Sequence, residues 1–383
     1  MYLDNAATSW PKPPEVVAAM REFQETSAAN PGRSGHRMSI QAARVVYETR
    51  QAVADLLGAK DPLRVIFGLN ITDGLNLALH GLLKSGDHVI TSSMEHNSVM
   101  RPLRELVRKG VEMTQVTCAP DGTLEPKMVE REVKPNTRMI VLNHASNVCG
   151  TLLPIQEVAR IARNNGLLFL VDAAQTAGVL PVDMLDDHID LLGFTGHKSL
   201  YGPMGNGGLL VGERVDPGEL HPMRQGGTGS RSEHEEQPDF FPDCYESGTP
   251  NAIGLSGLLA ALSWLGERGV TNIRAHEEAL CAELLDGLAH IRGVEVYGTR
   301  DAKKQTATVA FNIRGMEPST VGLRLDEQHG VLCRVGLHCA PSAHRTLGTF
   351  PYGCVRFGLG VFNTFDDVQD ALKAVHQLAR EER

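Results

Sequence analysis

The sequence has no apolar run that approaches the ~20 residues needed for a membrane-spanning helix. Its first residues, Met1-Tyr2-Leu3-Asp4, also lack the basic segment and the following apolar segment of a secretory signal. These two absences argue against a membrane protein and against a secreted protein. We therefore expect a cytoplasmic protein without a membrane partner.

The sequence also lacks an excess of basic charge. Its 37 lysines and arginines are outnumbered by 46 aspartates and glutamates, which gives a net charge of -9 at pH 7. No basic stretch along the chain overturns this balance. Because nucleic acids and anionic membrane surfaces attract positive charge, neither is an expected partner.

Cysteine is sparse and shows no pairing pattern. The 7 cysteines are odd in number and scattered, and no two of them have Cys-x-x-Cys spacing. This pattern argues against a disulfide scaffold and against a zinc ribbon, and we predict no metal site. At least one thiol is therefore left over for chemistry.

The length and apolar content of the chain indicate a two-lobed α/β protein. Single hydrophobic cores stop growing near ~250–300 residues, whereas this chain has 383 residues, 42% of them hydrophobic. Predicted strands alternate with predicted helices between residues 64 and 211, which is typical of a mostly parallel sheet covered on both faces. We predict an N-terminal arm over 1–14, a large domain over 15–263 and a smaller C-terminal α+β domain over 264–383.

A glycine-bounded loop carries a lysine directly after a predicted strand. The largely apolar run 189–194 predicts a strand that ends at Thr195 and is followed by Gly196, His197 and Lys198. A lysine amine attacks an aldehyde only when it is deprotonated, and burial or nearby positive charge favours this state by lowering the pKa of the amine. His197 is a candidate for that positive charge. Lys198 is thus a candidate nucleophile, although a lysine that caps the strand and points to solvent fits the same loop.

A carboxylate follows the preceding predicted strand. Residues 167–171 are all apolar and lead directly to Asp172. The carboxyl ends of strands form the ligand-binding edge of open α/β sheets, so Asp172 and Lys198 are expected at the same edge. A carboxylate ~4 Å from a pyridinium nitrogen gains roughly 4 kcal/mol of gross attraction at an effective dielectric constant near ~20, and it keeps the ring protonated. This pair is expected of an enzyme that uses pyridoxal phosphate as an electron sink.

The motifs Asp172-Ala173-Ala174-Gln175 and Thr195-Gly196-His197-Lys198 resemble those of class V, fold-type I pyridoxal-phosphate enzymes. Within that class, the chain is similar to the cysteine desulfurase and selenocysteine lyase family. The resemblance runs from the segment 2–8, Tyr-Leu-Asp-Asn-Ala-Ala-Thr, to the segment 355–359, Val-Arg-Phe-Gly-Leu. It implies a fold-type I architecture with a seven-stranded sheet in the large domain, and pyridoxal 5'-phosphate as the cofactor.

The resemblance assigns cofactor contacts to individual residues. It implies that Lys198 holds the cofactor covalently, that His96 stacks on the ring and shuttles protons, and that Thr249 reaches the phosphate of a neighbouring subunit, so that the protein is a homodimer. Thr72 is expected near the N-cap of a helix whose unpaired amides bind the phosphate. The predicted cofactor-binding residues are Thr72, His96, Asn147, Asp172, Gln175, Thr195, His197, Lys198 and Thr249.

The resemblance also implies a site for L-cysteine as the substrate. The planar guanidinium of Arg356 can bind the substrate carboxylate bidentately, with Asn147 beside it. Arg33 and His36 belong to a polar glycine loop that contacts substrate in the family, although solvated loop charges explain them equally well. Cys339 lies in a loop bounded by Gly336 and Pro341, where the family accepts sulfur as a persulfide, and His338 is a candidate for activating its thiol. The predicted catalytic residues are Lys198, Cys339 and His96.

The implied reaction converts L-cysteine to L-alanine and leaves sulfur on Cys339, for transfer to a sulfur-acceptor protein. L-selenocysteine is a further candidate substrate, and the pathway served, iron-sulfur cluster assembly or another, is left open. A related C-S lyase or class V aminotransferase would share Lys198 without using Cys339. A non-catalytic scaffold is disfavoured by the intact Lys198, Asp172 and Arg356. Two departures from the family pattern bear on the choice of acceptor: Leu337 replaces a histidine of the cysteine loop, and Asn97 stands where many relatives have a second histidine.

Overall fold

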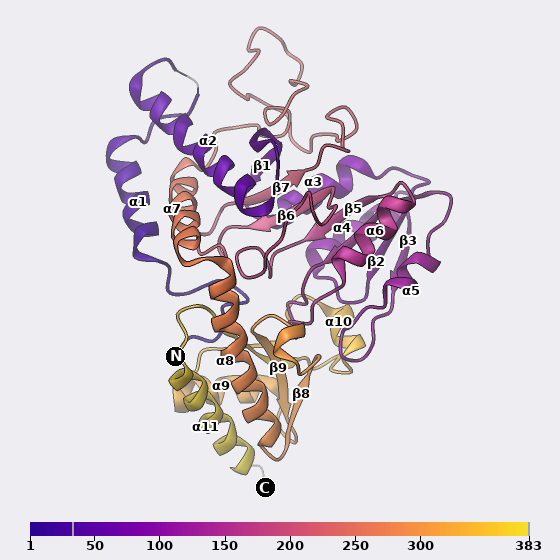
Figure 1. The fold of residues 1–383 in the computed structure, drawn as a ribbon, viewed down its shortest axis with the longest axis vertical. Coiled ribbons are helices and arrows are strands. Elements are labelled where there is room, and N and C mark those ends of the chain that lie inside the picture. Colours follow the sequence, from indigo (N-terminus) through magenta and orange to yellow (C-terminus); the bar gives the residue numbers. More distant parts are fainter. Residues whose placement is uncertain (33, 382–383) are drawn as a thin grey trace.

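The computed structural model describes residues 1–32 and 34–381, and its helices and strands gather around two sheets (Figure 1). In the described residues, no helix combines the length and the apolar character needed to cross a membrane. The helices are α1 (Pro14–Thr26), α2 (Arg37–Leu57), η1 (Pro62–Arg64), α3 (Ile71–Leu82), α4 (Asn97–Arg108), α5 (Pro126–Arg131), α6 (Ile155–Asn164), α7 (Ala252–Arg268), α8 (Val270–His290), η2 (Ala302–Lys304), α9 (Pro318–His329), α10 (Pro341–Thr346) and α11 (Phe365–Glu381). The strands are β1 (Val65–Gly68), β2 (His88–Ser92), β3 (Glu112–Val116), β4 (Thr137–Asn143), β5 (Leu168–Asp172), β6 (Leu191–Thr195), β7 (Gly207–Val211), β8 (Val294–Tyr297), β9 (Thr308–Ile313), β10 (Arg334–Gly336) and β11 (Cys354–Gly358).

The larger sheet has seven strands in the order β1-β7-β6-β5-β4-β2-β3. The pairs from β6 through β5, β4 and β2 to β3 are all parallel, whereas β7 pairs antiparallel with both of its neighbours. The prediction of a mostly parallel seven-stranded sheet is therefore confirmed. The parallel pairing also brings the carboxyl ends of β2, β4, β5 and β6 to one edge, where open sheets bind their ligands.

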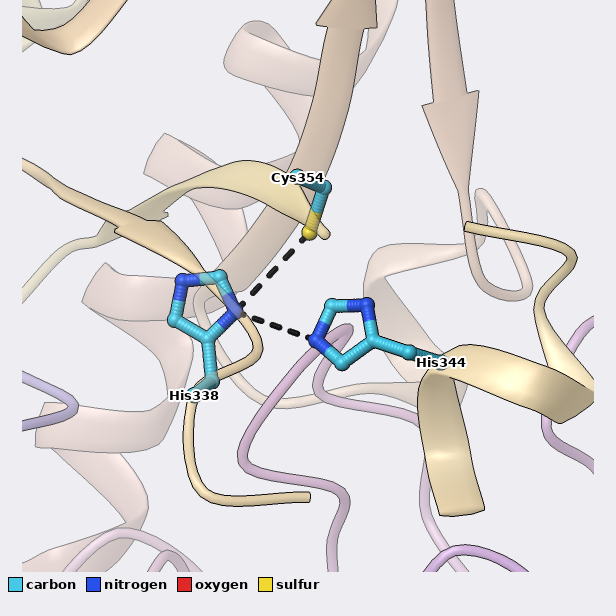
Figure 2. A group of neighbouring side chains, drawn as sticks. All are labelled: His338, His344 and Cys354. Carbon is cyan, nitrogen blue, oxygen red and sulfur yellow. Dashed lines mark hydrogen bonds between the residues drawn. The ribbon is translucent and has the colours of Figure 1, made fainter. Parts of the chain in front are cut away.

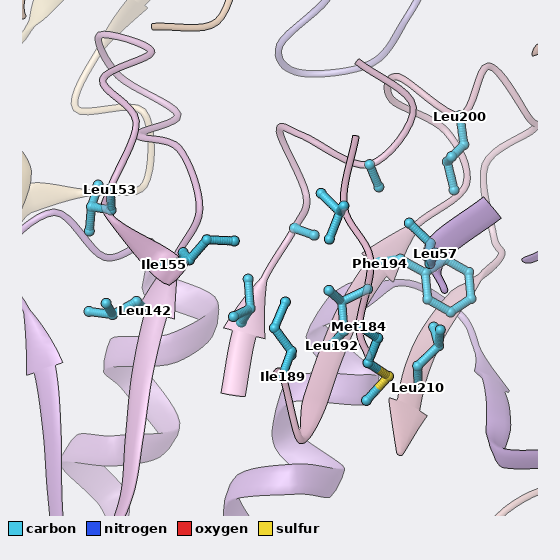
Figure 3. Close-up of a cluster of buried hydrophobic side chains, with 14 of the residues drawn as sticks. Leu57, Leu142, Leu153, Ile155, Met184, Ile189, Leu192, Phe194, Leu200 and Leu210 are labelled. Atoms are coloured by element: carbon cyan, nitrogen blue, oxygen red, sulfur yellow. The ribbon is translucent and has the colours of Figure 1, made fainter. Parts of the chain in front are cut away.

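Alternate side chains of this sheet face two different apolar cores. In β5, Phe169 and Val171 belong to a core shared with α2, α6 and α7, whereas Leu168 and Leu170 belong to a core shared with α3 and α4. Figure 3 shows part of the first core, where Phe194 of β6 lies near Leu57 of α2. A strand that is covered on both faces needs apolar residues at every position, which explains the continuous apolar runs that end at the site.

Helix α3 packs closely against the sheet and begins at its carboxyl edge. Gly74 permits this approach, because a Cβ at that position would lie 2.5 Å from the carbonyl oxygen of Gly208. The side chain of Asn70 caps the helix by accepting a hydrogen bond from the backbone N–H of Asp73. Thr72 is the second residue of the helix, two positions after this cap, and so lies near the N-cap as expected.

The smaller sheet has four strands in the order β10-β11-β9-β8, all paired antiparallel. Helices α8 and α9 pack against it and α11 packs against these two helices, around a separate apolar core, in the orange and yellow part of Figure 1. Leu3, from the start of the chain, belongs to this core of the small sheet. Within α8, Ile273 belongs to the core that contains Phe169, and Leu280 belongs to the core of the small sheet. The limits of the domains, placed by the sequence at 14/15 and 263/264, stay a prediction.

Candidate active site

A cavity of about 260 Å³ opens where the carboxyl edge of the large sheet meets the small sheet. Four residues of its wall lie at or after the carboxyl ends of strands: His96 after β2, Asn147 after β4, Asp172 at the end of β5 and Lys198 after β6. The small sheet adds Arg334 of β10 and Arg356 of β11. The cavity thus brings together these predicted site residues: Thr72, His96, Asn147, Asp172, Gln175, Thr195, His197, Lys198 and Arg356.

The environment of Lys198 lowers the pKa of its amine. Burial lowers this pKa to about 8, Asp172 acts against the shift, and the positive charges of Arg356 and Arg334 act with it. The N-terminal arm holds the loop in place, because the hydroxyl of Ser9 donates to the carbonyl oxygen of Lys198 at 2.7 Å. The loop therefore presents a buried amine that can lose its proton near neutral pH, as a nucleophilic lysine requires.

Asp172 ends β5 inside the protein. One of its carboxylate oxygens accepts a hydrogen bond from the backbone N–H of Ala174 at 2.9 Å. Burial raises the pKa of this carboxyl group, and the Ala174 N–H and the Lys198 amine oppose that rise. A positive charge brought into the cavity would favour the ionised form further, so Asp172 is suited to hold a protonated ring nitrogen.

The two cavity histidines are neutral near pH 7. Burial lowers the pKa of His96 and of His197 to about 4, and the positive charge of Lys198 acts in the same direction on both. The expectation that His197 supplies positive charge to Lys198 is therefore wrong; Arg356 and Arg334 supply it instead. His96 also caps α4, where its Nδ1 accepts the backbone N–H of Ser98 at 3.1 Å. The proton of the neutral ring is consequently on Nε2.

Several buried polar atoms of the cavity residues have no partner within the described protein. They are Oγ1 of Thr195, Nδ1 of His197, Oδ1 of Asn143, Oδ1 of Asn147 and Nε of Arg356. Buried polar groups almost always form hydrogen bonds, so this set is suited to a polar ligand. The adjoining N-terminus of α3 and the cations Lys198, Arg334 and Arg356 favour an anionic ligand. The residues present therefore fit a phosphate-bearing cofactor that has an aldehyde for Lys198 and a basic ring nitrogen for Asp172.

Arg356 is almost completely buried between the two sheets. Its Nη1 donates to the carbonyl oxygen of Asn147 at 2.9 Å, and its Nη2 forms an ion pair with Oδ1 of Asp4 at 2.7 Å. These two contacts fix the plane of the guanidinium and leave Nε unpartnered. The result is a pre-oriented cation in the cavity wall, which is suited to a substrate carboxylate.

Cys339 lies outside the cavity wall but is connected to it through Arg334. The thiol is exposed, and Nη2 of Arg334 contacts its Sγ at 3.5 Å. Both His338 and Cys339 have positive φ angles, 48° and 57°, a conformation that costs non-glycine residues energy. Contacts from the segments that follow β2 and β4 hold this turn. Nδ2 of Asn147 donates to the carbonyl oxygen of His338 at 2.7 Å, and the backbone N–H of Asn97 donates to the carbonyl oxygen of Cys339 at 2.8 Å.

The expected role of His338 as the activator of Cys339 is not what the structure shows. Its Nε2 donates to the carbonyl oxygen of Arg334 at 3.3 Å, and its Nδ1 faces Nε2 of His344 at 3.3 Å. Burial lowers the pKa of the His338 imidazole to about 2, so it has little tendency to take a proton. Both ring nitrogens are occupied inside the protein, and the side chain that contacts the thiol is Arg334.

Besides Cys339, two predicted residues of the described chain, His36 and Thr249, do not line this cavity. His36 is exposed and caps α2 by accepting the N–H of Ser39 at 3.3 Å. Thr249 lines a separate cavity of about 260 Å³, next to Arg224 and Thr228, and its hydroxyl accepts a hydrogen bond from Asn30 at 3.3 Å. Arg33 lies outside the described residues. The predicted role of Thr249 concerned a neighbouring subunit and stays a prediction.

Two charged residues of the site were not singled out from the sequence: Arg334, which lines the cavity, and Asp4, which pairs with Arg356. Arg334 stands five residues before Cys339, within the loop motif that identified the cysteine, so the motif itself was an available signal. Asp4 belongs to the N-terminal motif 2–8, but its pairing with Arg356 joins residues 352 positions apart. Single-sequence reasoning has no signal for such a long-range ion pair.

Comparisons with known proteins identify the family to which the chain belongs. Residues 1–371 match the family model "Aminotransferase class-V". The chain is 34% identical to a "Probable cysteine desulfurase" of Methanothermobacter thermautotrophicus, over 99% of this chain and 94% of the relative, and 33% identical to a "Cysteine desulfurase" of Escherichia coli, over 98% and 93%. The apo structure of the cysteine desulfurase from Thermococcus onnurineus NA1 superposes with a TM-score of 0.93 at 32% identity, covering 100% of this chain and 95% of that one. The chain belongs to the aminotransferase class-V family.

Proposed function

We propose that this protein is a pyridoxal-phosphate-dependent cysteine desulfurase, which converts L-cysteine to L-alanine and keeps the sulfur as a persulfide on Cys339. The observation that carries the proposal is the position of Arg334, which lines the Lys198 cavity and also contacts Sγ of Cys339 at 3.5 Å. An exposed thiol thus contacts an arginine of the cavity that also contains a buried amine. The relatives that are named cysteine desulfurases support the same function.

The cofactor would be held by residues that already surround the cavity. Lys198 would bind its aldehyde, Asp172 its ring nitrogen and His96 the face of its ring, while its phosphate would meet the N-terminus of α3, with Thr72, Thr195 and His197 nearby. Gln175 and Asn147 complete the cofactor-binding set. When bound, pyridoxal phosphate withdraws electrons from the carbon atoms next to the amine of the substrate, which weakens the C–S bond.

The side chains of the protein bind the substrate, transfer protons and accept the sulfur. Arg356 and Asn147 orient the carboxylate of L-cysteine. Nζ of Lys198, whose pKa is about 8, can both take and return a proton near neutral pH. The thiolate of Cys339 attacks the substrate sulfur, the Cβ–S bond breaks, and a proton returns to Cβ. L-cysteine and one enzyme thiol thus become L-alanine and one enzyme persulfide, with no outside oxidant or reductant.

The proposal is tested by measuring alanine and sulfide from L-cysteine with the purified holoenzyme. Alanine should form in proportion to sulfide when a reductant is present, because the reductant removes sulfur from Cys339 and restores the thiol. L-serine, which presents a hydroxyl in place of the thiol, should yield no alanine. Transfer of the amino group from L-cysteine to a keto acid, without release of sulfur, would favour the aminotransferase alternative.

Cofactor loading should report the lowered pKa of Lys198. With a pKa of about 8, about a tenth of the Lys198 amines are neutral at pH 7, whereas an ordinary lysine has far fewer. The rate at which apoprotein takes up pyridoxal phosphate should rise about tenfold from pH 6 to pH 7 and level off above pH 8. The absorbance of the bound cofactor measures this rate. A rate that still rises steeply above pH 9 would show that the Lys198 amine has the ordinary pKa of a lysine.

Replacing Asp172 with asparagine should lower the rate of alanine formation by about 10²-fold, because the ring nitrogen loses a negative partner whose gross attraction is roughly 4 kcal/mol. The thermal midpoint should not fall, since burial already disfavours the charge of this carboxylate. Gln175→Ala is the matched control from the same loop. Its Nε2 donates only to the carbonyl oxygen of Ala6, so its loss should cost less activity. A near-native rate for Asp172→Asn with cofactor bound would end the electron-sink argument.

Arg356→Lys should raise KM for L-cysteine by about tenfold to hundredfold, which corresponds to losing one charge-assisted hydrogen bond. A lysine cannot hold Asp4 and the carbonyl oxygen of Asn147 while also offering a planar pair of donors. Arg334→Lys is the control, because Arg334 lines the same cavity but contacts Cys339. Initial rates at varied concentrations of L-cysteine give KM for both variants. A larger rise in KM for Arg334→Lys than for Arg356→Lys would mean that Arg334, and not Arg356, binds the substrate carboxylate.

A homodimer belongs to the same proposal. Thr249 lies outside the Lys198 cavity of its own chain, which agrees with its expected role at the cofactor phosphate of a second subunit. Light scattering should give twice the mass of one chain, and Thr249→Ala should weaken the retention of pyridoxal phosphate. The exposed thiol of Cys339 leaves the persulfide open to a sulfur-acceptor protein.

A further inference from the structure

Three buried side chains converge at a point outside the Lys198 cavity. Nδ1 of His338, Nε2 of His344 and Sγ of Cys354 all lie within 4.8 Å of one another. They come from the cysteine loop, from α10 and from the start of β11 (Figure 2), and at most 2% of any of them is exposed. We propose that these residues bind one thiophilic d10 metal ion, Zn²⁺ or Cu⁺, close to the catalytic cysteine.

The spacing of the three atoms suits a single ion. Two nitrogen ligands at ~2.0–2.1 Å from a tetrahedral ion lie roughly 3.3 Å apart, and Nδ1 of His338 is 3.3 Å from Nε2 of His344. A sulfur at ~2.3 Å would lie roughly 3.6 Å from each nitrogen, and Sγ of Cys354 is 3.9 Å from Nδ1 of His338. Sγ of Cys354 also lies within 4.8 Å of Nε2 of His344, so a movement of the Cys354 side chain toward the two imidazoles would bring all three atoms into a common coordination sphere.

The outward-facing nitrogens of both imidazoles are already held. Nε2 of His338 faces the carbonyl oxygen of Arg334 at 3.3 Å, and Nδ1 of His344 faces the hydroxyl of Thr349 at 2.7 Å. Metal-binding histidines almost always have such a partner on the second nitrogen, which fixes the ring and its tautomer. A carbonyl can only accept, so the proton of the neutral His338 ring is on Nε2, and Nδ1 has one lone pair facing the cluster.

Hydrogen bonds alone do not satisfy the cluster as fully as an ion would. The single lone pair on Nδ1 of His338 is approached by both His344 and Cys354, and it can accept only one of them well. A metal ion instead takes one lone pair from each of the three atoms. On binding, the Cys354 thiol gives its proton to solvent and an S–metal bond replaces the S–H bond.

The chemistry of the three donors selects the kind of ion. Thiolate and imidazole favour Zn²⁺ or Cu⁺ over the oxygen-seeking Mg²⁺ and Ca²⁺. One thiolate cancels one positive charge, and the nearby Arg356 is itself paired with Asp4 at 2.7 Å. Because the site is buried, the ion would enter as the chain folds. The ligands are separated by five and nine residues, a pattern that no short spacing motif predicts, which is why the sequence indicated no metal.

The metal content of the purified holoenzyme tests this proposal. Protein expressed with added Zn²⁺, and separately with added Cu⁺ under reducing conditions, should retain about one ion per chain after dialysis against EDTA. X-ray absorption at the edge of that metal should show two nitrogen neighbours and one sulfur neighbour. Cys354→Ala and His344→Gln should each lower the bound metal at least about tenfold. Cys281→Ser, which changes an equally buried thiol far from the cluster in sequence, should retain it.

Two results would overturn the proposal. One is wild-type protein that retains neither ion in a stoichiometric amount, which would make the cluster a metal-free hydrogen-bonded group. The other is metal that persists equally in Cys354→Ala and His344→Gln, which would place the ion elsewhere. If both variants fail to fold, the X-ray absorption of the wild-type protein decides, since a neighbour shell without sulfur excludes Cys354 as a ligand. All of these readouts are independent of desulfurase activity.

Discussion

Replacing Lys198 with alanine is expected to lower the formation of alanine from L-cysteine by at least about 10³-fold. The change removes the amine that would hold the cofactor and the group that would move a proton at the substrate, and proton transfer alone contributes about 10²–10⁴-fold. The expected loss therefore exceeds that of any other substitution in the cavity. Initial rates of alanine formation, measured at matched cofactor content, give the size of the effect.

Lys12 is a matched control for this experiment. Burial lowers the pKa of its amine to about 8 as well, and its Nζ donates to the carbonyl oxygen of His197 at 2.7 Å, next to Lys198. Lys12→Ala should retain most activity, because Lys12 does not line the cavity. Borohydride reduction of the holoenzyme followed by peptide mapping should find the cofactor on Lys198. Finding it on Lys12, or on another lysine, would end the proposed assignment.

The second large effect is expected for Cys339→Ser, which should abolish persulfide formation and lower the rate of alanine formation at least about tenfold. A serine hydroxyl is a poor nucleophile towards sulfur, whereas a thiolate attacks it readily. Cys333→Ser is the control, since Cys333 is partly buried and burial raises the pKa of its thiol to about 12. If Cys339→Ser releases alanine at the wild-type rate, a C–S lyase that needs only Lys198 replaces the desulfurase proposal.

The elements of the large sheet could be predicted because local sequence determines them. The apolar runs that end at Asp172 and Thr195 are buried on both faces of the sheet, and such strands need continuous apolar residues. Parallel pairing then places their carboxyl ends at one edge, so the meeting of Asp172 and Lys198 in one cavity followed from topology. The resemblance to known enzymes supplied the remaining residues of this edge.

Charge states and long-range partners could not be predicted in this way. His197 and His338 were expected to assist Lys198 and Cys339, but burial, which depends on the whole fold, lowers the pKa of both imidazoles. The contact between Arg334 and Cys339 depends on a turn with two positive φ angles. Likewise, the convergence of His338, His344 and Cys354 arises only when β11 and α10 pack around the cysteine loop.

Peptide mass spectrometry of the wild-type holoenzyme after treatment with L-cysteine, without reductant, tests most directly whether sulfur moves to Cys339. The peptide that contains Cys339 should gain the mass of one sulfur atom, and the gain should disappear on adding a reductant. The separate peptides that contain Cys333 and Cys354 should gain no sulfur. Alanine formation with unmodified Cys339, or with the added sulfur on another cysteine, would contradict the account.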